Sequence, residues 1–553
     1  MKKDSFLKGA FMSMFFIIVG KIIGILYIVP LHKTIGEEKG ALYAHAYSNY
    51  EIFTTLSWAI SLAVSKIVSE YDTLKFLKTK ARVYKLAKIM VVTVSLFCSV
   101  GLFMFASVIS KIILGQSKNT ANSVDDITFV LRIVSLSLVF VGILGCTRGY
   151  LQGNKYISIA SASQVFEQLI RVVFILVVGC YLVPKVLKLD KTSSVSAMVF
   201  SATIAAIVTY IYLKYKIRKD KISRKINYEI SNEEKNITNK LIIKRIIFTA
   251  LPFAIVGISD SAYAIVNSWT VVKTLNTNCG YSGKDADIIY SVISVYSQKL
   301  NAIVGAVALG LIQSLLPNLA GDLVKSNLDE LKKKINKTLQ LLFLLTIPMA
   351  AGLSFLAEPV WTLFFSSDKN FGSKIFAFGV FTTIFSSVEV NVGMMSQALN
   401  RFKTACIASF CGLLTNAILN VPLMIWFNKI GLKAYNAPNT ATMLGLLVSI
   451  TVNLVFLKRA YKISFKPAFK QLLISIFATL VMIVSLNLFK HVISVYNGGL
   501  LKSLMTVFIF SLIGSVVYIT VVVKVSSTDD VLEKHAIKNF ISKICLRFQS
   551  KNR

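Results

Sequence analysis

Long stretches without charge constrain this chain more than any other feature. Residues 472–489 and 503–523 contain no Asp, Glu, Lys or Arg, and a helix of about 20 such residues spans the hydrocarbon core of a bilayer. Hydrophobic residues make up 55% of the chain and charged residues only 16%, with a mean hydropathy of +0.67. Soluble globular proteins do not have such a composition. We therefore predict an all-α polytopic membrane protein.

Fourteen transmembrane helices follow from the distribution of apolar runs and charges. Each predicted span is a run of roughly 20 to 28 residues bounded by charged or turn-forming residues. The first run is too long for the apolar core of a signal peptide and lacks a small-residue cleavage site, so we expect it to be retained as a span. The predicted spans are 9–30, 44–68, 86–113, 127–150, 157–183, 194–213, 246–272, 288–315, 338–357, 373–399, 404–427, 437–457, 468–489 and 500–523.

Basic residues are concentrated in alternate connections between these spans. The connection at 214–245 alone contains eleven Lys and Arg residues. The positive-inside rule places such connections in the cytoplasm. We therefore predict a multi-pass protein of the cell membrane with both termini in the cytoplasm.

A short internal repeat divides the chain into two halves. The turn Asn154-Lys155-Tyr156 after span 4 is matched by Asn400-Arg401-Phe402 after span 10. Six spans per half keep both halves in the same orientation, and parallel repeats of this kind enclose a central site in transporters. We predict two six-helix lobes around a central cavity. The parts are an N-lobe (1–213), a basic cytoplasmic linker (214–245), a C-lobe (246–457), spans 13 and 14 (458–525) and a basic cytoplasmic tail (526–553).

The sequence argues against several classes of function. A formal net charge of +35 would suggest a nucleic-acid partner in a soluble protein, but cytoplasmic loops give a membrane protein the same excess. We therefore predict no nucleic-acid binding. The seven cysteines lack the paired spacing of metal or disulfide sites. No catalytic motif is present, so we predict neither an enzyme nor a cofactor.

Three basic residues are candidates for binding an anionic substrate. Lys21 and Lys299 are near the centres of spans 1 and 8, where a charge costs at least about 2.5 kcal/mol unless it is paired or hydrated. Either they line a cationic cavity, or they pair across helices with Asp260 or Glu389. Lys66, at the cytoplasmic end of span 2, either joins them or extends to the membrane interface.

Span 5 carries a polar face. Gln164, Glu167, Gln168 and Arg171 follow the spacing of one helix face, and Glu167 and Arg171 are four residues apart. Opposite charges at this spacing can pair on the same helix. We predict that Glu167 and Arg171 form a structural ion pair that helps to hold helices together.

Several oxygen-bearing side chains of the C-lobe could bind a small cation. Asp260 is in span 7, Asn416 and Asn420 are about one turn apart in span 11, and Thr440 begins span 12. Hard cations take ligands of this kind. Ordinary polar contacts between helices explain the same residues equally well, so no metal site is firmly predicted.

Two motifs near the end of span 4 and in span 5 resemble a known family. Residues 147–154 read Thr-Arg-Gly-Tyr-Leu-Gln-Gly-Asn, and residues 163–171 read Ser-Gln-Val-Phe-Glu-Gln-Leu-Ile-Arg. They resemble the stage V sporulation protein B and polysaccharide-biosynthesis group. That group contains the MurJ-type lipid II flippases of Gram-positive bacteria, within the multidrug/oligosaccharidyl-lipid/polysaccharide exporter superfamily. The resemblance extends from the first helix through span 12.

The resemblance implies a substrate site and a cation site. Basic residues on spans 1, 2 and 8 of this family line the central cavity and engage the lipid-linked pyrophosphate, and the matching positions are Lys21, Lys66 and Lys299. Family members also place a sodium site among spans 7, 11 and 12, at positions comparable to the four oxygen-bearing residues named above. Two positions depart from the pattern. Ile28 stands where relatives often have a second basic residue, and Ile303 where span 8 often has proline.

We therefore expect a flippase that moves an undecaprenyl-pyrophosphate-linked saccharide, most specifically lipid II, from the inner to the outer leaflet by alternating access. The alternative is a multidrug or other lipid-linked oligosaccharide or polysaccharide exporter of the same superfamily. Spans 13 and 14 favour the flippase, because drug exporters of this superfamily usually stop at twelve. The expected partners are the lipid-linked substrate, membrane lipids and the cell-wall synthesis machinery. We expect the membrane potential alone to be able to drive transport, and the sequence does not identify whether Na⁺ or H⁺ is coupled to it.

Overall fold

The computed structural model describes residues 15–16, 19–20, 23–24, 27–115, 117–219, 234, 236–306, 328–365, 371–399, 401–492 and 499–525. All the elements in these ranges are helices, joined by short connections. Twelve helices in these ranges are long and apolar enough to cross a membrane. The predicted all-α polytopic fold is confirmed. Spans 1 and 8 and the linker 214–245 lie partly outside the described residues, and the tail 526–553 lies wholly outside them.

The chain divides into two compact units. Unit 1 comprises the ranges 1–303, 369–382 and 401–453, and unit 2 comprises 304–368, 383–400 and 454–553. The first unit thus contains spans of both predicted lobes. The division into an N-lobe and a C-lobe at the linker stays a prediction.

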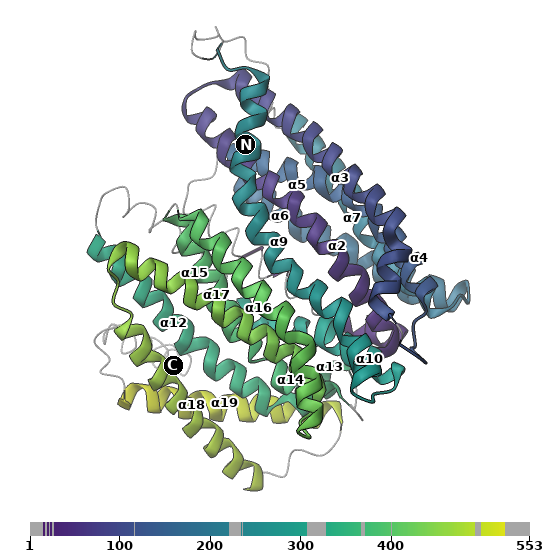
Figure 1. Cartoon of the computed structure of the whole chain (residues 1–553), viewed down its shortest axis with the longest axis vertical. Helices are drawn as coiled ribbons and strands as arrows, with labels where there is room; N and C mark the ends of the chain where they lie inside the picture. The colour runs from purple at the N-terminus through teal and green to yellow at the C-terminus, as the bar shows by residue number, and fades with distance from the viewer. Residues whose placement is uncertain are drawn as a thin grey trace, which may run out of the picture. The chain divides into compact units, whose positions relative to one another are not determined.

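Unit 1 is organised around α2, which contacts α3, α5, α9 and α10. Figure 1 shows α2 and α9 running side by side. Span 4 consists of α4 and α5, which meet at Leu136, and span 5 consists of α6 followed by the π-helical η1. The elements of unit 1 are α2 (Ile28–Thr73), α3 (Leu77–Leu114), α4 (Val124–Ser135), α5 (Ser137–Gly153), α6 (Ile157–Phe174), η1 (Ile175–Val186), α7 (Lys191–Lys219), α9 (Asn239–Asn278), α10 (Gly283–Ser291), η2 (Val292–Tyr296), α14 (Gly372–Gly379), α16 (Phe402–Lys429), η3 (Ala434–Asn436) and most of α17 (Ala437–Tyr461).

Helix α2 begins well before the predicted span 2 and is kinked near its start. Gly36 interrupts the helical geometry with φ 74°, a conformation that glycine adopts without the strain of a side chain. The Tyr296 hydroxyl donates a hydrogen bond of 2.9 Å to the Gly36 carbonyl. The kink is therefore joined to the end of η2.

Close contact between α2 and α5 depends on glycine. Gly145, Gly149 and Gly153 recur every fourth residue of α5 and share one face. The Ser61 hydroxyl donates to the Gly145 carbonyl at 2.6 Å, and a Cβ at Gly149 would lie only 2.3 Å from the Ser61 carbonyl oxygen. Small residues allow such approach between membrane helices, whose association relies on tight packing. Gly149 and Gly153 of the family-like motif therefore serve helix packing.

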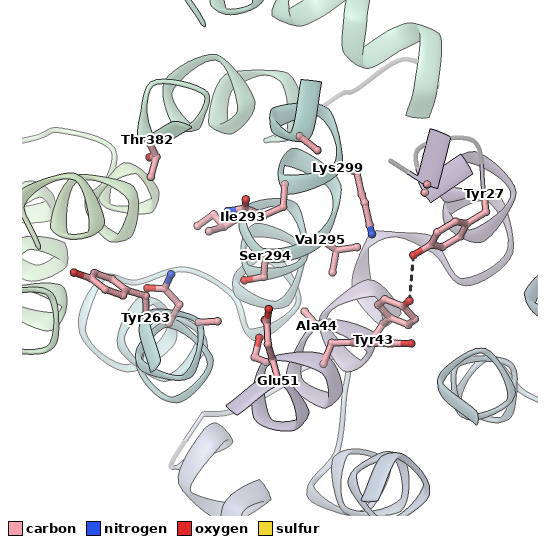
Figure 2. A pocket seen from close by; sticks show the side chains of 18 of the residues that line it. Tyr27, Tyr43, Ala44, Glu51, Tyr263, Ile293, Ser294, Val295, Lys299 and Thr382 are labelled. Carbon is pink, nitrogen blue, oxygen red and sulfur yellow. Dashed lines mark hydrogen bonds between the residues drawn. The ribbon is translucent and has the colours of Figure 1, made fainter. Parts of the chain in front are cut away.

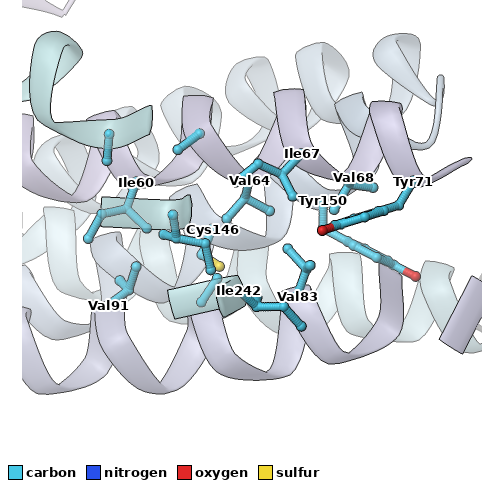
Figure 3. Packing of buried hydrophobic residues seen from close by; sticks show 14 residues of the cluster. Ile60, Val64, Ile67, Val68, Tyr71, Val83, Val91, Cys146, Tyr150 and Ile242 are labelled. Carbon is cyan, nitrogen blue, oxygen red and sulfur yellow. The ribbon is translucent and has the colours of Figure 1, made fainter. Parts of the chain in front are cut away.

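An apolar cluster joins α2 to α3, α5 and the first half of α9 (Figure 3). Its α2 members recur every three or four residues, which places them on one face of the helix. The cluster ties the beginning of α9 into the same core as α2. Its buried members are Ile60, Ala63, Val64, Ile67, Val68, Tyr71, Val83, Ala87, Val91, Cys146, Tyr150, Ile242, Ile246 and Ala250.

Unit 2 contains the last two predicted spans. Helix α18 packs against both α12 and α19. The Tyr518 hydroxyl on α19 donates to the Leu344 carbonyl on α12 at 2.8 Å, and the Asn336 amide on α12 donates to the Ser464 carbonyl at 3.0 Å. Spans 13 and 14 are therefore packed onto span 9. The elements are α12 (Leu328–Phe355), α13 (Ala357–Phe365), α15 (Thr382–Ala398, whose first residue belongs to unit 1), α18 (Lys466–Val492) and α19 (Leu500–Val525).

We expect Gly149→Ala to lower the melting temperature of the purified protein, because the added methyl group would overlap the α2 backbone and overpacking costs roughly 1–3 kcal/mol. Gly101→Ala on α3 is the matched control, since a Cβ at that position meets no atom within 4 Å. Alanine is also the better helix former, so the control should melt at or above the wild-type temperature. Equal melting of the two variants would contradict the close contact between α2 and α5.

Candidate functional site

A cavity of about 700 Å³ lies inside unit 1. Its volume is within the range of about 300–1,000 Å³ that is typical of small-ligand sites. Aromatic, amide and charged side chains line it together, so it can receive a ligand that carries both polar groups and charge. The lining includes the charged residues Glu51, Arg171 and Lys299, the tyrosines Tyr27, Tyr43, Tyr47 and Tyr263, and the amides Gln164, Gln168, Asn267, Gln298 and Asn439.

Lys299 faces a pair of tyrosines across this cavity. Its Nζ lies 5.3 Å from the centroid of the Tyr27 ring, and the hydroxyls of Tyr27 and Tyr43 are 3.4 Å apart. Figure 2 shows the ammonium group pointing toward the pair, with Glu51 on another side of the cavity. A cation over an aromatic face is stabilised by the ring electrons. The lysine is therefore held in the cavity, with its ammonium group against the tyrosine pair.

The other two lysines predicted to bind substrate are placed differently. Lys66 is exposed on α2 and is not part of the cavity lining. Lys21 lies outside the described residues. Of the three, the structure brings only Lys299 to the described cavity.

Glu167 and Arg171 form one side of a three-residue cluster. Their side chains approach to 3.1 Å, between Glu167 Oε1 and Arg171 Nη2, while Glu167 Oε2 lies 2.8 Å from Arg148 Nη1. Arg148 also donates from Nε to the Ser163 hydroxyl at 2.8 Å and from Nη2 to the Ser163 carbonyl at 2.9 Å. The carboxylate thus links α6 to α5. One negative charge meets two positive ones, so the cluster as a whole is cationic.

The residues predicted for a cation site lie on neighbouring helices but have separate partners. Asn420 donates to Asn267 Oδ1 at 2.8 Å, and its own Oδ1 accepts from the Thr270 hydroxyl at 3.1 Å. Asn416 donates to the Thr442 hydroxyl at 3.3 Å. The side-chain amides of α16 are therefore joined to α9 and α17.

Thr440 and Asp260 complete that predicted set. The Thr440 hydroxyl donates to the Asn436 carbonyl at 3.1 Å, which is a contact within its own helical turn. Asp260 is on α9, but its side chain is outside the described part of the structure. Asn416 Oδ1 is buried without a hydrogen-bond partner among the described residues. It is the ligand atom of the set that the structure leaves open for a cation.

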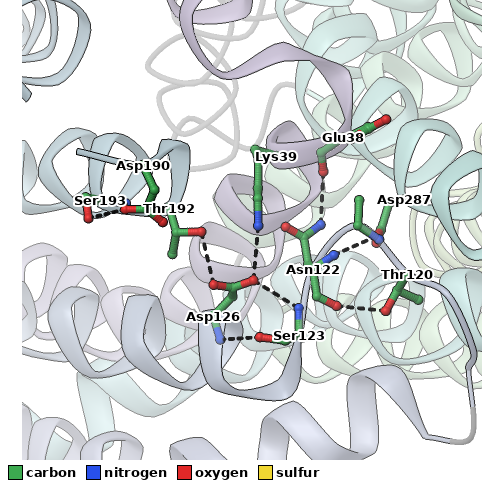
Figure 4. A network of polar contacts seen from close by, with 11 residues as sticks. Glu38, Lys39, Thr120, Asn122, Ser123, Asp126, Asp190, Thr192, Ser193 and Asp287 are labelled. Atoms are coloured by element: carbon green, nitrogen blue, oxygen red, sulfur yellow. Dashed lines mark hydrogen bonds and ion pairs between the residues drawn. The ribbon is translucent and has the colours of Figure 1, made fainter. Parts of the chain in front are cut away.

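Polar contacts join three segments at the end of unit 1 that the charge pattern predicts to be outside the cell (Figure 4). Asp287 of α10 is fully buried, and its Oδ2 accepts the backbone N–H groups of Ala121 at 2.8 Å and Asn122 at 3.3 Å. The Asn122 amide in turn donates to the Glu38 carbonyl at 2.9 Å. These bonds, named the Asp287 clasp below, tie α10 to the connection before α4 and to the start of α2.

A second carboxylate at this end holds three elements. Asp126 accepts hydrogen bonds from Lys39 Nζ and from the Thr192 hydroxyl, both at 3.0 Å. Nearby, in the connection before α7, a hydrogen bond from the Ser193 hydroxyl holds the pKa of Asp190 below its ordinary value. Burial instead raises the pKa of Asp287 to about 7. Asp190 and Asp287, both at this end of unit 1, therefore titrate in different pH ranges.

Several residues of this site were not expected from the sequence. Arg148 belongs to the first quoted motif. Its contact with Glu167 joins two different helices, so the spacing of residues along one helix does not predict it. Tyr43, Tyr47 and Glu51 recur every fourth residue of α2, and this helical period could have identified a polar, aromatic face.

Comparison with known proteins agrees with the motif resemblance. Residues 6–315 match the model of the polysaccharide biosynthesis protein family, and the chain belongs to that family. The lipid II flippase MurJ of Bacillus subtilis (strain 168) is 26% identical over 525 residues, which cover 93% of this chain and 94% of that protein. The predicted relationship is confirmed, and the chain is a multi-pass protein of the cell membrane.

Two solved structures share the fold. A lipid II flippase MurJ in an inward closed conformation has a TM-score of 0.63 at 17% identity and covers 92% of this chain and 97% of its own. An inward-facing multidrug resistance MATE family transporter of the MOP superfamily has a TM-score of 0.64 at 13% identity, over 80% of this chain and 94% of its own. The relatives are named as flippases and transporters and not as enzymes, in agreement with the predicted class.

The charge balance of the Arg148–Glu167–Arg171 cluster predicts unequal effects of mutation. We expect Glu167→Gln to lower the melting temperature and folded yield strongly, because it leaves two guanidinium groups without a carboxylate, and an unpaired buried charge costs about 3–5 kcal/mol. Arg171→Gln should have a much smaller effect, because Glu167 and Arg148 still form a neutral pair. Size-exclusion profiles and melting curves of the purified variants test this. A loss in Arg171→Gln as large as that in Glu167→Gln would contradict the assigned pairing.

Proposed function

We propose that the protein is a flippase for lipid-linked saccharides and that lipid II is its substrate. The observation that carries the proposal is the cavity of unit 1, where Lys299 faces the Tyr27–Tyr43 pair among amide side chains. A lipid-linked headgroup has an anionic pyrophosphate and an uncharged sugar. Cationic side chains bind the pyrophosphate, and aromatic and amide side chains can contact the sugar. The relative named a lipid II flippase, aligned over nearly the whole chain, supports the same substrate.

In the proposed mechanism the headgroup enters the cavity while the polyprenyl chain stays in the surrounding lipid. Lys299 holds the pyrophosphate. From the family resemblance, Lys21 is proposed as a further contact of the pyrophosphate. Lys66 is exposed and lies outside the cavity lining, so it would contact the pyrophosphate only before or after the headgroup occupies the cavity. The headgroup therefore crosses the membrane without being exposed to hydrocarbon, which would cost the charged group many kcal/mol.

Alternating access requires that the outer end of the cavity close and open in turn. The Asp287 clasp joins segments of both predicted lobes, since Glu38 and Asn122 belong to the first half and Asp287 to the second. We assign to it the role of holding the outer end closed. Release of the substrate to the outer leaflet would then require these hydrogen bonds to break.

A sodium ion at Asp260, Asn416, Asn420 and Thr440 would adjoin the cavity, because Asn267 and Thr442, which contact this set, also line it. The open oxygen of Asn416 supports such a site. Asn420 Oδ1 accepts a hydrogen bond from the Thr270 hydroxyl. It would have to give up this bond to bind the ion. Coupling to an ion is therefore proposed as an addition to the transport step and not as its basis.

Growth rescue tests the function. Expression of this chain in a bacterium depleted of its own lipid II flippase should restore growth, and Lys299→Ala should abolish the rescue at equal membrane levels. Lys429→Ala is the control, since Lys429 is an exposed lysine outside the cavity. Rescue by Lys299→Ala as good as wild type would contradict the role of the cavity. Failure of the folded wild-type chain to rescue would exclude lipid II in favour of another saccharide lipid.

The Asp287 clasp predicts a change in outside accessibility. In a Ser294→Cys background, where the new thiol lines the cavity, Asp287→Ala should increase labelling by a membrane-impermeant maleimide added outside intact cells. The substitution removes the acceptor of two backbone N–H groups, each such bond contributing about 1 kcal/mol. Lys284→Ala, an exposed change on the same helix, should leave labelling unchanged. Equal labelling with and without Asp287 would refute the gate assignment.

A further inference from the structure

The two arginines of the cationic cluster are not equivalent. Arg148 uses Nε, Nη1 and Nη2, binding Ser163 and Glu167 with all three, and it is not part of the cavity lining. Arg171 lines the cavity. Its ion pair with Glu167 uses only one of its nitrogens, Nη2. Its Nε is buried without a hydrogen-bond partner in the described part of the chain. Arg148 thus balances the carboxylate, and the charge of Arg171 is left to the cavity.

Tyr47 presents a second open donor beside this arginine. Its ring packs 4.5 Å from the Tyr43 ring, and its hydroxyl is buried with no hydrogen-bond partner in the described ranges. Tyr47 and Arg171 both line the cavity. A buried donor without a partner costs about 1–3 kcal/mol. Two such donors on residues that line one cavity are explained when a ligand accepts hydrogen bonds there.

Lys299 and Arg171 line the same cavity. Lys299 lies over the Tyr27 ring, whose hydroxyl is 3.4 Å from the Tyr43 hydroxyl. The cavity therefore has two cations. A diphosphate has two phosphoryl groups and can occupy both, whereas a monophosphate can occupy one. The planar guanidinium suits a phosphoryl group because it donates two parallel hydrogen bonds.

We infer that Arg171 and Tyr47 form a second anion subsite, so that the cavity recognises a lipid diphosphate through Lys299 at one phosphoryl group and through Arg171 with Tyr47 at the other. The inference rests on the proposed function, because the diphosphate is that of the lipid-linked substrate. It adds a selectivity that Lys299 alone does not provide. The protein should distinguish the loaded carrier, a diphosphate, from the monophosphate form of the same lipid.

Lipid binding to the full chain in nanodiscs tests this, with undecaprenyl diphosphate and undecaprenyl monophosphate as probes. The wild type should bind the diphosphate about tenfold more tightly than the monophosphate. One additional hydrogen bond to a charged group contributes roughly this much to the affinity. Arg171→Gln should remove this preference by weakening only diphosphate binding, and Tyr47→Phe should reduce it without a change in folding. Arg132→Gln, on α4 with its guanidinium against the Phe103 ring, is the matched control outside the cavity.

Each outcome decides between the proposals. Binding of neither lipid by the folded wild type would defeat the proposed function and the subsite together. Diphosphate selectivity that survives both Arg171→Gln and Tyr47→Phe would overturn the subsite and leave the proposed function standing. An equal loss for both lipids in Arg171→Gln would also overturn it, because a second subsite should affect the diphosphate alone. If Arg171→Gln does not fold, the conservative Tyr47→Phe variant decides by the same criteria.

Discussion

The Glu167 carboxylate, shared between Arg148 and Arg171, is the interaction on which the candidate site depends. Charges within a membrane protein are tolerated only where they are paired or hydrated. Arg148 anchors the carboxylate to the Ser163 turn, so the carboxylate in turn fixes the position of Arg171 at the cavity wall. A single guanidinium in that position would be mobile and costly. The contacts of Glu167 with both arginines make Arg171 a rigid, cationic part of the lining.

The same region shows how packing and chemistry are combined in one stretch of sequence. Gly149 lies one residue after Arg148 and brings α5 against the α2 backbone. Arg148 is therefore held at a fixed distance from the helix that carries Tyr43 and Tyr47. The motif that resembles the family thus contains both the residues that let two helices approach and the residue that organises the charges between them.

The sequence predicted most of the fold and part of the site. Membrane spans could be located because each one must satisfy its own backbone hydrogen bonds over about 20 apolar residues, and the Glu167–Arg171 spacing is a local property of one helix. The break at Leu136, the kink at Gly36 and the contact of Arg148 with Glu167 depend on neighbouring helices. No local pattern encodes them. Lys299 could be found because a mid-membrane charge is exceptional, whereas tyrosines such as Tyr27 are common in membrane helices.

If the proposed transport cycle operates, the two cations of the cavity would also decide where in the cycle voltage acts. A bound diphosphate offsets the charges of Lys299 and Arg171, so the loaded protein would change conformation with little net charge in the electric field. The empty protein returns with these charges uncompensated, and each elementary charge carried inward gains about 2.3 kcal/mol per 100 mV of inside-negative voltage. Electrical work would then be concentrated in the return of the empty carrier. Voltage would reset the protein rather than push the lipid.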